Sequence, residues 1–369
     1  MRPAEQQSAP TSGRVRRLAR GALAAAAYAL GVTKPARALA GRLTIVTLHR
    51  VLPPERRARY PLPHLAVPPR FFDELLAALA ASFECLPLHE AVAAAAAPQR
   101  RDGKPLLALT FDDGMRDNFE FARPLLARHK VRATFFAVAG NARSGELLWH
   151  DRLAYAAAHA ARAGSDDDGV RGGAALRAKL RDAADPARLD ALWAQRRSPS
   201  FAHAVVRFAK TLPEGARARL EEALAEAAPG AVRPDWEGLM DFAQLRELAR
   251  DGHEVGSHSM THALLKRELA PDFARETAGS RALLREATGV EVRSFCYPDG
   301  AHDDAAVEAV RAAGYAAAVT TRPGTNRPPL APFELARVNV EAEPNQSGDG
   351  ALSIPRLLLR LHPRGARGS

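Results

Sequence analysis

The sequence has only two cysteines among its 369 residues. Cys85 and Cys296 lie in apolar surroundings and have no paired spacing. A disulfide framework needs several cysteines, and a cysteine metal site needs closely spaced pairs, so the sequence favours neither. We expect both thiols to be small buried residues.

Aromatic residues are also scarce, at 6% of the chain, whereas alanine is abundant. The apolar fraction of 47% is nevertheless that of a globular protein, and a chain of this length can bury one large core or two smaller ones. Much of that core must therefore consist of Ala, Leu and Val.

No apolar run reaches the ~18 residues that a transmembrane helix needs. Near the N-terminus, however, the basic residues 14–20 precede an apolar, Ala-rich run at 21–32. The small residues 38–41 follow, and the whole pattern imitates a secretory signal with a cleavage site. Against cleavage, Lys34 and Arg37 fall between the apolar run and the supposed cut.

We therefore predict that residues 1–41 are a retained basic and apolar segment, with a helix that touches an anionic membrane surface. This places the protein in the cytoplasm or peripheral to the membrane. The alternative is export through a cleaved N-terminal signal.

The formal charge of +10 and the pI near 10.2 favour acidic partners, such as anionic lipid or an acidic glycan. A solvated, Arg-rich surface is the simpler explanation of the same charge. No nucleic-acid signature accompanies it, so we expect no nucleic-acid partner.

Short apolar runs alternate with longer segments whose apolar residues recur every three or four positions. This alternation is typical of parallel βαβ units, in which functional residues gather at the carboxyl ends of the strands. The predicted strands are 43–48, 106–111, 133–138, 254–256, 294–297, 316–320 and 335–340.

One stretch, residues 146–240, interrupts the alternation and is predicted to be a helical insertion, with helices at 147–162, 174–195, 201–211 and 216–228. It divides the predicted catalytic barrel into residues 42–145 and 241–345. A basic C-terminal tail, residues 346–369, follows. Trp149, near the start of the insertion, is a candidate sugar contact, and its alternative role is to anchor the insertion in the core.

Two motifs far apart in the sequence together indicate a metal site. Residues 109–114 read Leu-Thr-Phe-Asp-Asp-Gly after a predicted strand, and residues 256–262 read Gly-Ser-His-Ser-Met-Thr-His. The two histidines of the second motif are four apart, which on a helical turn places both imidazoles on one face. One carboxylate and two imidazoles leave a fourth position open, as in a catalytic zinc site. The other carboxylate is then free to act as a base. Alone, the first motif would be a solvated turn, and the second seldom binds metal.

These motifs resemble those of the polysaccharide deacetylases with a NodB-homology domain, whose patterns T-F-D-D-G and H-[ST]-x-x-H match without a mismatch. The resemblance covers roughly residues 42–340, broken by the insertion. It implies a distorted, incomplete (β/α) barrel of about seven parallel strands with a helical insertion. It extends to the segments at 132–138, 251–258, 295–300 and 314–321.

The resemblance also assigns roles to residues. Asp113, His258 and His262 correspond to the metal ligands, and Asp112 to the general base. The segment Phe-Cys-Tyr-Pro-Asp-Gly is similar to a motif in which a backbone N–H after the proline helps to hold the oxyanion, and Asp299 would supply that N–H.

The chain departs from the family in two places. The family often has an arginine just before the proline pair, which tethers the catalytic aspartate, whereas this chain has Cys296 there. Arg293 is the candidate substitute. The family also commonly ends with a Leu-x-His general acid. The C-terminal candidate here is His362 in the basic segment Leu359-Arg360-Leu361-His362. The acid is therefore unassigned. His49, at the end of the first predicted strand, could line the cleft, and its alternative role is structural.

The combined prediction is a metal-dependent hydrolase that removes N-acetyl groups from a polysaccharide or lipid-linked glycan, and so modifies cell-surface polysaccharide. Zinc suits the ligand set best, and cobalt, nickel or manganese are alternatives. An O-acetyl esterase or deformylase on the same scaffold, and a non-catalytic glycan-binding protein, are the competing hypotheses.

Overall fold

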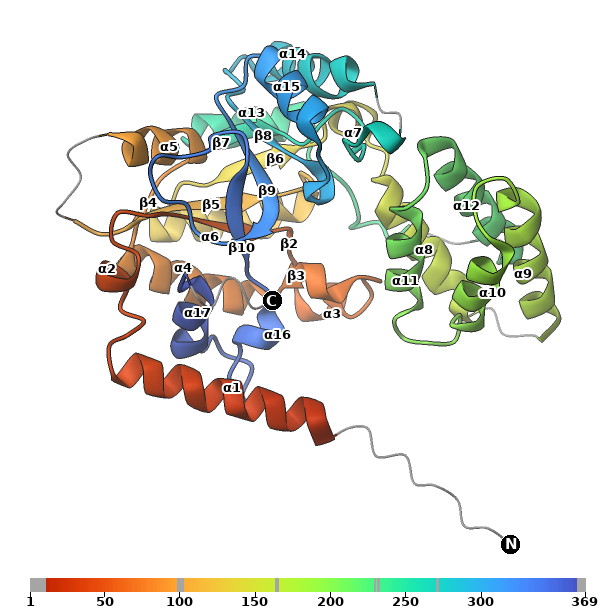
Figure 1. Cartoon of the computed structure of the whole chain (residues 1–369), viewed down its shortest axis with the longest axis horizontal. Helices are drawn as coiled ribbons and strands as arrows, with labels where there is room; N and C mark the ends of the chain where they lie inside the picture. Colours follow the sequence, from red (N-terminus) through yellow and green to blue (C-terminus); the bar gives the residue numbers. More distant parts are fainter. Residues whose placement is uncertain are drawn as a thin grey trace, which may run out of the picture.

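Seven parallel strands form a closed ring at the centre of the computed structural model, which describes residues 11–97, 103–162, 166–228, 230, 233–269 and 272–363 (Figure 1). The ring confirms the predicted barrel of about seven parallel strands. In sequence order its strands are β1 (Leu43–Leu48), β5 (Leu106–Phe111), β6 (Thr134–Ala137), β7 (Glu254–Ser257), β8 (Ser294–Cys296), β9 (Ala317–Pro323) and β10 (Leu335–Asn339).

The strands are hydrogen-bonded in the order β1-β10-β9-β8-β7-β6-β5, and pairing of β1 with β5 closes the ring. Leu43 lies beside Leu106, and the register continues to Leu48 beside Phe111. The ring is irregular between β9 and β10, where the register shifts. A short strand, β4 (Glu84–Cys85), adds to β5, and β2 (Arg50–Val51) pairs with β3 (Ala66–Val67) in a separate small sheet.

The strands are continuous apolar runs because both of their faces are covered. All six residues of β1 and all six of β5 are buried, as expected for parallel strands between a barrel interior and a layer of helices. Within the core, the Phe111 and Phe135 rings stack with centroids 4.9 Å apart.

Helices cover the outside of the ring (Figure 1). In α4 the buried residues are Phe71, Phe72, Leu75, Leu76 and Leu79, a three-and-four spacing that puts one apolar face on the barrel. The outer helices are α4 (Pro69–Ser82), α5 (Leu88–Ala96), α6 (Arg123–His129), α7 (Ala139–Ser144), α13 (Phe242–Arg250), α14 (Ser280–Thr288) and α15 (Asp304–Ala312).

The insertion is a bundle of helices beside the barrel, green in Figure 1. It comprises α8 (Trp149–Arg162), α9 (Asp166–Leu180), α10 (Pro186–Ala194), α11 (Phe201–Ala209) and α12 (Glu214–Ala227). The single helix predicted over 174–195 is wrong: the chain breaks after Leu180 and restarts at Pro186, where the Asp185 carboxylate accepts a hydrogen bond from the Ala187 N–H. Proline is compatible with the first turn of a helix but not with its interior.

A buried ionic network joins the insertion to the barrel. The Arg50 guanidinium, 1% exposed, lies 2.7 Å from a carboxylate oxygen of Asp117 and 2.7 Å from one of Glu237. The Tyr155 hydroxyl on α8 donates to Glu237 at 2.5 Å. The Tyr60 ring packs 4.4 Å from the same guanidinium. Removing one member would leave a buried charge without its partner, so this network fixes the position of α8.

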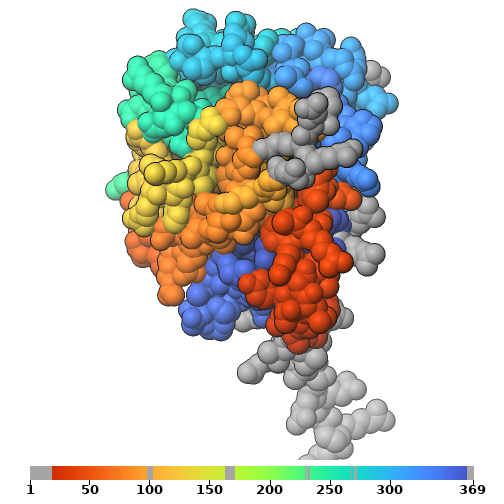
Figure 2. Space-filling view, turned by 90° about the vertical axis from the view of Figure 1, so that its left-hand side faces the viewer, coloured from red at the N-terminus to blue at the C-terminus, as the bar shows by residue number. Residues whose placement is uncertain are grey.

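The N-terminal and C-terminal helices lie against each other on one side of the barrel (Figures 1 and 2). They are α1 (Thr11–Ala29) and α17 (Ile354–Leu361), and the short helix α16 (Ala342–Asn345) contacts α17. Another short helix, α2 (Pro35–Ala38), lies between α1 and β1 in the chain. Leu357 and Leu361 of α17 are fully buried, so part of the predicted C-terminal tail is a packed helix. None of the helices in the described residues is long and apolar enough to span a membrane.

Candidate active site

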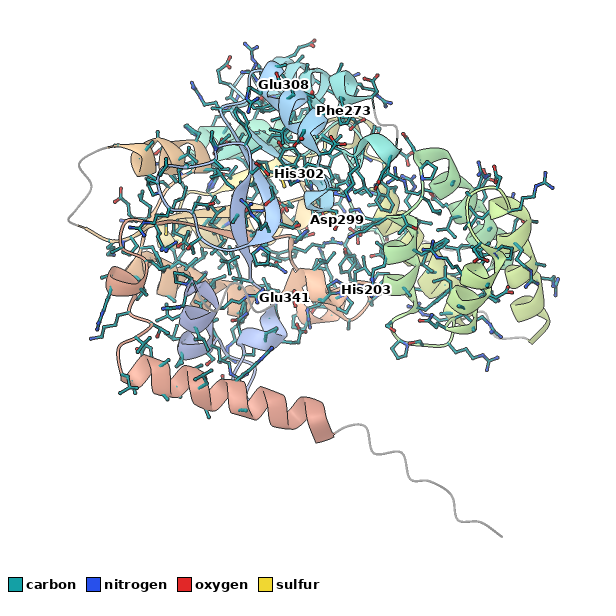
Figure 3. The ribbon with its side chains drawn as sticks, viewed as in Figure 1. His203, Phe273, Asp299, His302, Glu308 and Glu341 are labelled. Carbon is teal, nitrogen blue, oxygen red and sulfur yellow. The ribbon has the colours of Figure 1, made fainter. Side chains whose placement is uncertain are left out.

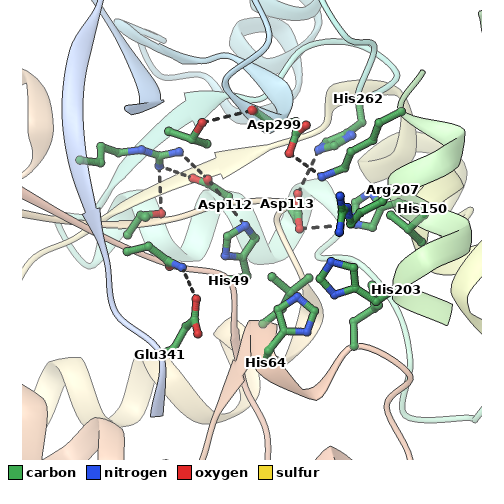
Figure 4. Close-up of a pocket in the computed structure, with 18 of the residues that line it drawn as sticks. His49, His64, Asp112, Asp113, His150, His203, Arg207, His262, Asp299 and Glu341 are labelled. Carbon is green, nitrogen blue, oxygen red and sulfur yellow. Dashed lines mark hydrogen bonds and ion pairs between the residues drawn. The ribbon is translucent and has the colours of Figure 1, made fainter. Parts of the chain in front are cut away.

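The two adjacent carboxylates lie at the carboxyl end of β5, where the chain turns sharply. Asp113 has a positive φ of 74°, and Gly114 follows with 70°. A side chain on Gly114 would come within 3.1 Å of the Ala137 backbone, so glycine is needed at this turn. The turn directs both Asp112 and Asp113, each almost fully buried, into one cleft (Figure 4).

The two histidines of the second motif come from the loop after β7. The expected helical turn is wrong, because Ser259 and His262 both have positive φ values, 69° and 58°. This loop nevertheless brings both rings to Asp113. The Nε2 atoms of His258 and His262 lie 3.5 and 3.4 Å from the Asp113 Oδ1.

The geometry of these three residues fits a divalent cation. Their ligand atoms lie within 4.8 Å of one another, and all three side chains are buried. The His258 Nδ1 is 2.8 Å from the Cys296 carbonyl, so its N–H donates there and leaves Nε2 free to bind metal. The set of one carboxylate and two imidazoles is the one expected for zinc.

Asp112 is held by an arginine on β10, which only β1 separates from β5 in the ring. The Arg337 guanidinium on β10 donates to both Asp112 oxygens, each at 2.7 Å. Arg337 is 2% exposed and also donates to the Thr47 hydroxyl and the Thr320 carbonyl. Burial by itself raises the pKa of Asp112, but the charge and hydrogen bonds of Arg337 outweigh it and lower the pKa to about 2. Asp112 is therefore ionised at neutral pH and is able to accept a proton.

The structure thus corrects the suggestion that Arg293 tethers the aspartate. Arg293 is exposed just before β8, and its carbonyl accepts from Ala316. Cys296, in the position expected for the tethering arginine, is fully buried, with its sulfur 3.3 Å from the Arg337 Nη2. A small side chain at position 296 leaves room for a guanidinium that arrives from β10.

Asp299 lies at the rim of the same cleft, in a short helical turn after β8. Its backbone has a positive φ of 55°. Its carboxylate forms an ion pair with Lys210, which follows α11 of the insertion. Figure 3 places Asp299 on the barrel side and His203 on the insertion side of the cleft. The ion pair therefore connects the two walls.

Trp149 is not among the residues that line this cleft. Its indole N–H donates to the His262 carbonyl at 3.0 Å, and the Arg217 guanidinium lies 4.6 Å from its ring. These contacts fasten α8 to the metal-ligand loop, which is the anchoring role rather than that of a sugar contact.

Two histidines approach the carboxylates from other elements. The His49 Nε2, directly after β1, is 4.0 Å from the Asp112 Oδ2, and its side chain is 24% exposed. The His150 Nε2 on α8 is 3.7 Å from the Asp113 Oδ2. Burial lowers the pKa of His150 to about 4, so its ring is neutral at pH 7. His150 was not expected to belong to any site. His362, the C-terminal candidate for the family's acid, is not among the residues lining the cleft.

The cleft has a volume of about 420 Å³, and both the barrel and the insertion contribute to its walls. The His203 ring on α11 of the insertion stacks on the His64 ring, which lies just before β3, with centroids 4.9 Å apart. The space suits a sugar unit, with the carboxylates and imidazoles at its base (Figure 4). Its wall also includes Leu62, Leu65, Val206, Arg207, Thr321, Pro323, Asn339, Glu341 and Arg360.

Fold and site together define a barrel hydrolase with a buried Asp-His-His set and an adjacent carboxylate. Residues 99–165 and 235–318 match a family model described as polysaccharide deacetylase. The chain therefore contains a polysaccharide deacetylase domain, which makes it a hydrolase acting on carbon–nitrogen bonds other than peptide bonds.

Solved structures share the fold. The Streptococcus pyogenes deacetylase PplD, in complex with acetate, is similar with a TM-score of 0.54 and 18% identity, over 87% of this chain and 98% of that chain. IcaB from Ammonifex degensii is similar with a TM-score of 0.51 and 20% identity, over 87% of this chain and 97% of that one. A comparison with curated protein sequences gives no match.

Proposed function

We propose that this protein removes N-acetyl groups from a polysaccharide or lipid-linked glycan. The reaction would use a divalent cation, preferably zinc, held by Asp113, His258 and His262. The observation that carries the proposal is the adjacency of this ligand set to Asp112, which is ionised and oriented by Arg337. A cation bound there would polarise the acyl oxygen and favour ionisation of the attacking water.

Asp112 accepts the proton of the attacking water. The bidentate contact with Arg337 keeps the carboxylate in one orientation, so no reorganisation is needed at the moment of attack. The oxygen that becomes negative as the carbonyl is attacked then accepts a hydrogen bond from the backbone N–H of Asp299.

The departing amine needs a proton, and we assign its donor to His49. This ring lines the cleft, its Nε2 is 4.0 Å from Asp112, and its partial exposure leaves it open to a bound sugar. His150 is the poorer donor because burial keeps its ring neutral.

A non-catalytic glycan-binding role would fit a chain that lacks both the arginine tether and the general acid of the family. Arg337 fills the place of the tether, and His49 is available as the acid, so both reasons for this role are weakened. Cleavage of an O-acetyl ester would use the same groups, but an ester leaves more readily and needs the acid less. The presence of His49 in a position to donate that proton therefore favours an N-acetyl amide as the substrate.

The test measures acetate release from N-acetylglucosamine oligomers and from the producing cell's own polysaccharide. The protein is first stripped of metal with a chelator and then restored with zinc, with cobalt, nickel and manganese in parallel. Asp112→Asn is the test variant, and Asp349→Asn, on the surface, is the matched control.

We expect release that requires metal, is abolished in Asp112→Asn and is unchanged in Asp349→Asn. Release of acetate from O-acetylated sugars alone would favour the esterase. Stoichiometric zinc uptake with saturable glycan binding and no release from any acylated sugar would overturn the hydrolytic role.

A further inference from the structure

The exposed apolar side chains of the molecule are concentrated in one short segment. In the described part of the chain, the large apolar residues found exposed are Leu23, Tyr28, Leu30 and Val32, at 61%, 46%, 77% and 49%. Leu23 and Leu30 are two helical turns apart, and the Leu30 N–H bonds to the Ala26 carbonyl, which continues the helical pattern. They therefore form one stripe along α1 and its C-terminal end.

The opposite side of α1 is packed against the protein. Ala24 is fully buried, and a side chain on Gly21 would come within 2.7 Å of the Arg356 guanidinium on α17. Leu39, further along the chain, belongs to the main core. The helix is thus fixed to the barrel by its small residues, and its larger apolar residues face outward, the reverse of the usual arrangement of a surface helix.

The charge around this stripe has a single sign. Between Glu5 and Glu55 the sequence contains no acidic residue. Arg20, Lys34 and Arg37 are exposed beside the stripe. Basic residues beside exposed leucines are the combination that binds an anionic lipid surface, where the leucines enter the interface and the cations contact headgroups.

The helix that carries the stripe packs against α17, which reaches the active-site cleft. Arg360 on α17 lines that cleft. Burial lowers the pKa of the Arg360 guanidinium, the Glu341 carboxylate raises it, and the positive charge of Arg20 on α1 lowers it. Figure 2 shows the N-terminal segment at the surface beside the blue C-terminal part of the chain. The docking face and the cleft wall are therefore connected through the contact of α1 with α17.

We propose that α1 and the turn that follows it, residues 20–37, form a docking surface for anionic phospholipid membranes. The face binds the membrane peripherally and does not cross it. This surface is separate from the catalytic groups, so it goes beyond the proposed deacetylation and can be tested independently of it.

The experiment is co-sedimentation of the full chain with large vesicles of phosphatidylcholine alone, or with 30% phosphatidylglycerol, at low and high salt. One variant, Leu23→Gln/Leu30→Gln, removes the apolar stripe. A second, Arg20→Gln/Lys34→Gln/Arg37→Gln, removes the adjacent cations. Since all five side chains are exposed, the variants should fold, which circular dichroism checks. The matched control, Lys130→Gln/Arg143→Gln/Arg250→Gln, removes three exposed cations elsewhere.

We expect binding to anionic vesicles that weakens with salt. Loss of the three cations should lower the partition coefficient about a hundredfold, at roughly fivefold for each basic residue near the surface. Loss of the two leucines should lower it about tenfold or more. The control variant should keep most of its binding.

Equal binding by all variants, or equal binding to neutral and anionic vesicles, would overturn the proposal. So would a dimer in solution that the leucine variant converts to a monomer, since a second copy would then occupy the stripe. Mass spectrometry of the protein from the producing cell adds a third check: a mature chain beginning after residue 38 would remove the surface and refute it.

Discussion

The ion pair between Arg337 and Asp112 allows a quantitative test of how the catalytic carboxylate is held. The two side chains are 1% and 4% exposed. The pKa of Asp112 falls from 3.8 to about 2 although burial opposes this change. At ~1.4 kcal/mol per pKa unit, the ionised form is favoured by about 2 kcal/mol after burial has been offset. The coupling energy of the pair should therefore exceed about 2 kcal/mol.

Arg337→Met keeps an unbranched stem and leaves the Asp112 carboxylate buried without a partner. We expect it to lower the free energy of unfolding by about 3 to 5 kcal/mol. Asp112→Asn should cost less, because Arg337 retains the Thr47 hydroxyl and the Thr320 carbonyl as acceptors. The double variant removes both charges and should be more stable than the sum of the single effects predicts.

The assay is urea unfolding of the four proteins in the presence of a chelator, so that metal binding does not contribute to stability. The exposed pair Arg128 and Asp73, 65% and 38% exposed, serves as control and should couple by less than about 1 kcal/mol. Additivity of the Arg337 and Asp112 effects within about 0.5 kcal/mol would refute the reasoning.

Three further predictions concern the cleft and the core. His49→Gln should lower acetate release from N-acetylglucosamine oligomers by about 10²-fold or more, yet largely spare 4-nitrophenyl acetate, whose leaving group needs no proton; equal losses on both substrates would contradict the role of donor. His253 accepts a hydrogen bond from the Ala133 N–H, and burial lowers its pKa from 6.5 to about 4. Its contribution to the free energy of unfolding is therefore complete above pH 6.5, because the ring is neutral there, and is lost as the pH falls from 6.5 through 4. The whole contribution is about 3 kcal/mol. His253→Asn, which keeps an acceptor, should remove that part of the pH dependence in urea titrations, and an unchanged slope would exclude His253 as its source. Lys210→Met should change the free energy of unfolding by less than about 1 kcal/mol, because both partners of the Lys210–Asp299 ion pair are partly exposed. It should nevertheless lower kcat/KM up to about tenfold, because it releases the turn that carries the Asp299 N–H. Unchanged kinetics would show that the ion pair does not position this turn.

The strands and the two carboxylates were predictable because their signals are local. The buried runs at 43–48 and 106–111 match β1 and β5 at both ends. Asp112 and Asp113 are the two residues immediately after the second run. Local patterns of this kind are determined by nearest neighbours, and a single sequence is sufficient to read them.

The rest of the site depends on contacts between distant parts of the chain. Asp112 and Arg337 are 225 residues apart, and no local pattern links them. An arginine inside the apolar run at 335–340 was the available signal, because a buried guanidinium requires a buried acceptor. His150 reaches Asp113 only because the insertion folds back on the barrel. The loop conformation of His258 and His262 depends on positive φ values that the spacing of the two residues does not reveal.

The hydrophobic core of the insertion includes side chains from the barrel, among them Leu52, Tyr60 and Leu62. Neither part can therefore be removed without exposing apolar surface of the other. The two should lose their structure in one cooperative transition, visible as a single calorimetric peak. The cleft between them is then formed in that same transition, so a substitution that unfolds either part should abolish the whole binding site.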